Sequence, residues 1–102
     1  MRKKYDLKKI PDSHRDDVEK AVDILENEGC EEVYLFGSLV EGTATKDSDV
    51  DIAAKGIPVG SFFKVYAALI KHLDHPVDLI SLENDDHFGN MLQEEGYLHR
   101  VI

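Results

Sequence analysis

Two aspartates separated by one residue, Asp49-Val50-Asp51, lie within the mostly hydrophobic stretch DVDIAA. Side chains alternate along a strand, so a strand here would project both carboxylates from one face and its apolar side chains from the other. Two carboxylates about 4 Å apart repel by roughly 1 kcal/mol in bulk water and about 4 kcal/mol at an effective dielectric of 20. A divalent cation would offset this repulsion, because Mg²⁺ prefers oxygen ligands and binds through one or two carboxylates plus substrate phosphates.

A Gly-Ser pair, Gly37-Ser38, ends the preceding strand-like stretch EEVYLF, and ten residues separate Ser38 from Asp49. Glycine permits a sharp turn and a close approach of the backbone to a ligand. Backbone N–H groups beyond Gly37, together with the Ser38 hydroxyl, can hold phosphate oxygens. Phosphate donors joined by one short loop to metal-binding acids indicate a site for metal–nucleotide chemistry.

A third acid, Asp78, lies in the later stretch PVDLIS between Val77 and Leu79, whose side chains would project from the opposite face. A carboxylate in an apolar strand costs stability unless it is paired or ligated. If this strand lies beside the one that carries Asp49 and Asp51, the three acids meet at one point. Such a set can bind two metal ions about 3.5–4 Å apart, the arrangement used for in-line phosphoryl or nucleotidyl transfer.

The elements that must position these residues alternate between helical and strand patterns. A helix is predicted after Pro11-Asp12-Ser13, with Ser13 as its cap and Gly29 as its stop. The remaining pattern predicts a helix over 61–73 with Ser61 as a possible cap, a short helix and an irregular tail over 88–102, and strands over 31–36, 49–54 and 77–82. This order predicts an α/β protein with a small two-layer fold, a mixed sheet packed against helices.

The composition limits the classes of protein that the chain can form. Its 102 residues suit one domain, 1–102, with residues 1–10 as a flexible basic N-terminus. No apolar run approaches the roughly 20 residues that span a bilayer, and no secretory signal is evident. The single cysteine, Cys30, fits a reducing cytoplasm, so a cytoplasmic location is expected. The net charge of −9 argues against direct nucleic-acid binding through phosphate attraction.

The combination of Gly37-Ser38, ten residues, Asp49-x-Asp51 and a later-strand Asp78 resembles the nucleotidyltransferase superfamily that includes DNA polymerase beta and the kanamycin nucleotidyltransferases. The resemblance covers residues 33–56 and 77–80 and implies a nucleotidyltransferase-like fold. In its short length the chain is similar to the minimal nucleotidyltransferases, which are often encoded beside a HEPN-domain protein as the antitoxin of a toxin–antitoxin pair.

The resemblance also implies a role for each matched residue. Gly37 and Ser38 would hold the terminal phosphates of ATP or another nucleoside triphosphate. Asp49 and Asp51 would bind two Mg²⁺ ions, for which Mn²⁺ is a possible substitute, and Asp78 would bind the ion nearer the incoming hydroxyl and help remove its proton. The implied reaction transfers a nucleoside monophosphate, AMP from ATP, to a hydroxyl of an acceptor and expels pyrophosphate.

One departure from the family pattern leaves two functions open. Many small members carry Arg after Gly-Ser or two residues further on, whereas this chain has Leu39, Val40 and Glu41. The acid spacing favours an enzyme that modifies a hydroxyl of a partner, which the resemblance implies is a HEPN-domain toxin. The missing arginine and the small size favour a catalytically weak or inactive antitoxin that neutralises a HEPN ribonuclease by direct binding. The acceptor, assembly as a homo- or hetero-oligomer, and the roles of His72 and His75 stay open.

Overall fold

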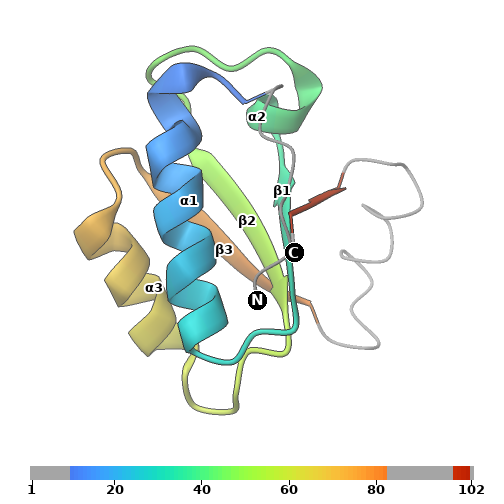
Figure 1. Ribbon diagram of the computed structural model, residues 1–102, viewed down its shortest axis with the longest axis vertical. Coiled ribbons are helices and arrows are strands. Elements are labelled where there is room, and N and C mark those ends of the chain that lie inside the picture. Colours follow the sequence, from blue (N-terminus) through green and yellow to red (C-terminus); the bar gives the residue numbers. More distant parts are fainter. Residues whose placement is uncertain (1–9, 83–97, 102) are drawn as a thin grey trace.

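The computed structural model describes residues 10–82 and 98–101, which form one four-stranded sheet with helices against one of its faces (Figure 1). The strand order is β3-β2-β1-β4, with β2 and β3 parallel and the other neighbouring pairs antiparallel. The predicted α/β class and mixed sheet are therefore confirmed. The elements in chain order are α1 Asp12–Asn27, β1 Glu32–Phe36, α2 Ser38–Glu41, β2 Val50–Lys55, α3 Phe62–His72, β3 Val77–Leu82 and β4 His99–Arg100.

The main core lies between the sheet and the two long helices. Both helices are amphipathic, because apolar residues recur every three or four positions and so share one face. The buried face of α1 is formed by Val18, Ala21, Val22 and Leu25, and that of α3 by Val65 and Leu69. Alternate strand residues complete this core, namely Val33, Leu35, Val50, Ile52, Ala54, Val77 and Leu79. The other residues of the strands therefore project from the opposite face of the sheet.

The predicted ends of the helices agree with the structure only in part. α1 begins at Asp12 with Pro11 in the N-cap position, and no side chain caps it. The Ser13 hydroxyl instead lies 2.9 Å from the Nδ1 atom of His14. Ser61 does occupy the N-cap position of α3 but makes no side-chain cap hydrogen bond. Gly29 is confirmed as the stop of α1, since it has a φ of +91° just beyond the helix end.

The predicted strands agree with the structure to within one residue at each end. Of residues 88–102, predicted to form a short helix and an irregular tail, residues 88–97 and 102 lie outside the described residues. Residues 1–9 of the predicted N-terminal segment also lie outside them, whereas Ile10 is buried. An irregular tail was expected at the C-terminus, yet His99–Arg100 form β4. This strand arises from pairing with distant β1, which a local pattern of two residues does not encode.

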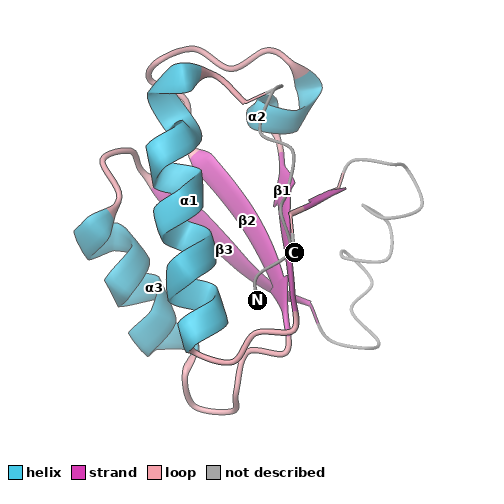
Figure 2. Cartoon of the chain, in the orientation of Figure 1, coloured by secondary structure: helices cyan, strands magenta, loops and turns pink. Residues whose placement is uncertain are grey.

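The loop from α2 to β2 crosses one end of the sheet, and α2 lies at that same end (Figure 2). α2 itself is a single turn that was not predicted from the sequence. Among the described residues, none of the helices combines the length and the apolar composition that crossing a bilayer requires.

Candidate active site

Two of the predicted site residues, Asp51 on β2 and Asp78 on β3, are direct partners in the register of the parallel strand pair. Their neighbours Ile52 and Leu79 are also paired and are buried in the core. Because side chains alternate along a strand, the two carboxylates lie side by side on the opposite face. Asp49 immediately precedes β2. The expectation that strands 49–54 and 77–82 are neighbours is therefore confirmed.

The negative charges of these acids act on one another. Burial raises the pKa of Asp51, and the nearby charges of Asp78 and Asp49 raise it further, from 3.8 to about 6. Asp51 is half-buried, whereas Asp49 and Asp78 are exposed. A cation placed among these carboxylates would relieve the repulsion and favour the charged form of Asp51. The donor set, carboxylate oxygens on an accessible surface, fits a hard divalent ion.

The acids are not gathered into a complete coordination set. Across residues 10–82 and 98–101, there is no group of three or more His, Cys, Asp or Glu side chains arranged to hold a metal ion. Mg²⁺ commonly takes only one or two carboxylates and completes its shell with water and substrate phosphates. The Asp51–Asp78 pair meets that requirement, and a metal site that includes Asp49 stays a prediction.

Gly37 brings the end of β1 against the carboxylate of Asp51. Its φ is +72°, a conformation that side-chain-bearing residues rarely adopt, and a Cβ at this position would overlap the Oδ2 atom of Asp51. Phe36, the residue before it, is the register partner of Asp51 across β1 and β2. Glycine is thus required here both by backbone conformation and by space, and Gly37 lies against the side chain of Asp51.

Ser38 begins the single-turn helix α2 directly after Gly37. The N–H groups of Val40 and Glu41 both donate to the carbonyl of Gly37 at 3.0 Å. The first N–H groups of a helix have no acceptor within the helix, and this holds for those of Ser38 and Leu39. Leu39 is only 1% exposed and anchors α2 in the core. The position after Gly37-Ser38 is therefore a packing position in this chain.

A buried polar cluster supports the loop in front of β2, and the sequence did not predict it. Its members are His14 and Asp17 on α1 and His75 before β3; His14 and Asp17 are at most 1% exposed. The Nδ1 atom of His75 lies 2.7 Å from Oδ2 of Asp17, and its Nε2 atom lies 2.9 Å from the carbonyl oxygen of Lys46. The signal available in the sequence was that His14 and Asp17 lie at helical spacing on the same face as apolar Val18.

The hydrogen bonds of this cluster shift both ionisable partners toward their charged forms. Burial alone would raise the pKa of Asp17, but N–H groups of Asp74 and His75 and the His75 ring lower it overall. The hydrogen bond to Asp17 is the main cause that raises the pKa of His75. Both shifts favour an ion pair between Asp17 and His75, and this contact gives His75, whose role the sequence left open, a structural part in the fold.

A surface hollow of about 320 Å³ lies away from the acids and is lined by Lys20, Asp23, Ile24 and His72. It contains none of the predicted site residues. Asp49 and Asp78 are instead exposed, so a ligand held by the carboxylates would lie on the surface of the sheet end.

Comparisons with known proteins support the fold of the chain and identify its family. One crystal structure, of a toxin-antitoxin with AMP-PNP, is 25% identical, covers 80% of this chain and 69% of its own, and has a TM-score of 0.64. A crystal structure of a mutant toxin-antitoxin MntA-HpeT is 24% identical over 83% of this chain and 71% of its own, also with a TM-score of 0.64, and supports the fold. A search of curated protein sequences found no match. Residues 19–98 match the family described as polymerase beta, nucleotidyltransferase, and the chain therefore belongs to that family.

Proposed function

We propose that the chain is a metal-dependent nucleotidyltransferase that transfers AMP from ATP to a hydroxyl of a partner protein. The observation that carries this proposal is the pairing of Asp51 with Asp78 across neighbouring strands, with the Gly37 turn placed against Asp51. Membership of the nucleotidyltransferase family supports the reaction class. The similarity to a toxin-antitoxin crystallised with AMP-PNP supports an adenine nucleotide as the donor.

Each site residue has a role that its position supports. Asp49 and Asp51 would hold two Mg²⁺ ions, with Asp78 as a further ligand to one of them; Mn²⁺ would substitute. The bound ions would neutralise charge on the phosphates in the transition state. Gly37 and Ser38 would bind the terminal phosphates through their N–H groups and the Ser38 hydroxyl.

The proposed reaction forms one bond and breaks one bond at the α-phosphorus of ATP. The oxygen of the acceptor hydroxyl attacks that phosphorus, and the bond to the pyrophosphate oxygen breaks. Asp78, exposed at the start of β3, accepts the proton of the hydroxyl. Positioning and charge stabilisation supply the rate enhancement, since no covalent intermediate with the protein is required.

The partner is proposed to be a HEPN-domain toxin, because the solved neighbours are toxin-antitoxin structures. The net charge of −9 suits association with a basic protein surface. Such a partner would also supply the positive charge that residues 39–41 lack. A location in the cytoplasm follows as part of the same proposal.

A second candidate is an antitoxin that neutralises its partner by contact, with little or no catalysis. The exposure of Asp49 and Asp78 favours it, because a nucleotide there would be only partly enclosed. The deciding experiment incubates the chain and its copurified partner with Mg²⁺ and α-labelled ATP, with Asp51→Asn in parallel. The enzyme hypothesis predicts label on the partner that the variant abolishes. Protection of cells by the variant, equal to wild type, would instead support inhibition by contact.

A further inference from the structure

His75 is held at both of its ring nitrogens. Its Nδ1 faces the Asp17 carboxylate and its Nε2 faces the Lys46 carbonyl, at 2.7 and 2.9 Å. Both partners are acceptors, so a hydrogen on each ring nitrogen satisfies both contacts, and the geometry favours the imidazolium form. Asp17 also accepts the backbone N–H groups of Asp74 and His75, at 3.0 and 2.9 Å. The ionisable groups facing the ring are Asp17 and His14 from α1 and Asp74 from its own loop.

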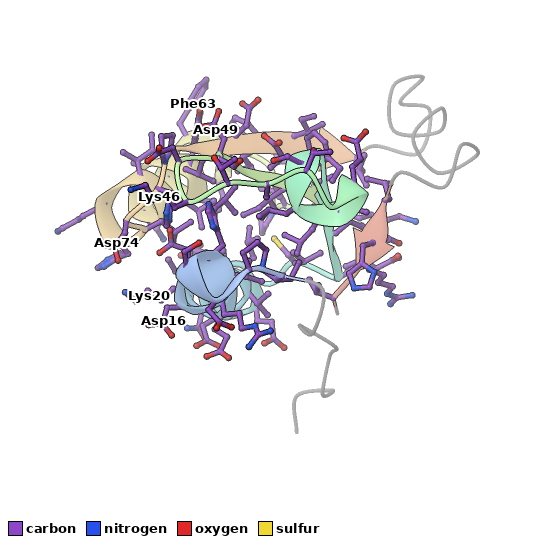
Figure 3. All side chains as sticks on the ribbon, turned by 90° about the horizontal axis from the view of Figure 1, so that it is seen from above. Asp16, Lys20, Lys46, Asp49, Phe63 and Asp74 are labelled. Carbon is purple, nitrogen blue, oxygen red and sulfur yellow. The ribbon has the colours of Figure 1, made fainter. Side chains whose placement is uncertain are left out.

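His14 supplies a second contact to the same loop. Its Nε2 lies 2.7 Å from the carbonyl oxygen of Ser48, which can only accept, so Nε2 donates. Its ring is stacked on that of His75, with 3.8 Å between centroids and 22° between planes. Two imidazole N–H donors therefore hold carbonyls two residues apart in the loop that enters β2. In the view of Figure 3, Lys46 lies between Asp49 and α1.

These contacts fix the chain on both sides of Asp49. The preceding carbonyl, of Ser48, is held by His14, and the following N–H, of Val50, donates to the Pro76 carbonyl at 2.8 Å. Pro76 directly follows His75, which is bonded to Asp17, and it precedes Asp78 by two residues. His14 and Asp17, two buried residues of α1, thus fix the backbone of the loops that carry Asp49 and Asp78.

We propose that His14, Asp17 and His75 are positioning residues for nucleotidyl transfer, holding the segments that carry Asp49 and Asp78 in register for a shared ligand. The effect on catalysis rests on the proposed function, whereas the fixing of the two loops rests on the observed contacts alone. None of the three touches the acids of the site in the contacts described here, so their effect is transmitted through the backbone of the two loops.

The test compares His75→Gln with His72→Gln. His72 is an exposed histidine in the last turn of α3, three residues away and outside the cluster, so it matches the change in side chain. In His75→Gln, kcat for label transfer from ATP is expected to fall at least tenfold, with KM for ATP within threefold of wild type, because the Gly37-Ser38 turn is not held by the cluster. In His72→Gln, both constants should match wild type.

Amide hydrogen exchange provides a second measurement that needs no activity. The Val50 amide in His75→Gln should exchange at least tenfold faster than in His72→Gln, at matched global stability. If His75→Gln does not fold, wild-type protein decides the matter, since the Nε2–H of His14, which is fully buried and faces the Ser48 carbonyl, should give a slowly exchanging ring-proton signal at neutral pH.

The outcomes separate the two proposals. A wild-type protein that transfers no label contradicts the proposed function, while the exchange data still decide the positioning role. If wild type is active, the positioning role is overturned when His75→Gln keeps the wild-type kcat. It is also overturned when the variant has a lower kcat and a higher KM for ATP, with no change in the exchange rate of the Val50 amide. Rapid exchange of the His14 Nε2–H in folded wild type overturns it as well.

Discussion

Replacement of Asp51 by asparagine should stabilise the metal-free protein while it removes the response to metal. In the folded chain, burial and the charges of Asp78 and Asp49 raise the pKa of Asp51 from 3.8 to about 6. A group with a raised folded-state pKa binds its proton more tightly in the folded state, so the stability it contributes is present at low pH and is lost as pH rises through about 6. Above that pH, the ionised carboxylate is a cost to folding.

The size of the effect follows from the shift. About two pKa units correspond to roughly 3 kcal/mol, since one unit is about 1.4 kcal/mol. Asp51 is half-buried, and solvent screening reduces this figure to about 1–2 kcal/mol. For a domain of this size, that change corresponds to a rise in Tm of roughly 5–10 °C.

The assay is thermal unfolding of wild type and Asp51→Asn in chelator at pH 7.5 and at pH 4. The variant should be more stable at pH 7.5 and nearly equal to wild type at pH 4, where Asp51 is protonated in the fold. Asp47→Asn, an exposed acid in the preceding loop, is the matched control and should show little change at either pH. A variant that is less stable than wild type at pH 7.5, or equally stabilised at both pH values, would refute the electrostatic reasoning.

Three further results are expected. Gly37→Ala should lose about 1–3 kcal/mol of stability through its positive φ, and more through overlap with Asp51. Gly60→Ala, with a φ of +84° and open space around the position, measures the cost of the φ angle alone, so equal losses of the two variants in urea unfolding would contradict the close approach. Leu39→Arg should destabilise by about 3 kcal/mol or more, since Leu39 is buried, so the charge cannot be restored there; a stable folded variant with tighter ATP binding would count against this. Glu41→Arg, at an exposed site at the end of α2, should lower the KM for ATP with little change in Tm, and an unchanged or higher KM would argue against a missing phosphate contact.

The strands that carry the acids could be predicted because alternation along a strand is a local signal. The pattern around Asp51 and Asp78 separates apolar from acidic faces, and the structure places both acids on one face as direct partners. The turn at Gly37 could also be predicted from the sequence, since a glycine before a polar residue at a strand end indicates an unusual backbone conformation.

The parts that could not be predicted depend on contacts between distant segments. The bond between Asp17 and His75 joins residues 58 apart, and β4 exists only through pairing with β1. A histidine before proline at a helix end gave no indication of an aspartate on another helix. The expected cap at Ser13 failed for a local reason instead: α1 begins at Asp12, so Ser13 lies inside the helix, and its hydroxyl lies 2.9 Å from Nδ1 of His14.

The most direct test of the account is a map of Mn²⁺ binding by paramagnetic broadening in the NMR spectrum of the chain. Divalent metal at the proposed site should broaden amide signals of residues 36–38, 49–51 and 77–79 first, and Asp51→Asn should abolish this selectivity. Broadening confined to other acidic residues, such as those on the exposed face of α1, would contradict a metal site at these carboxylates. Broadening that is unchanged in Asp51→Asn would contradict it as well.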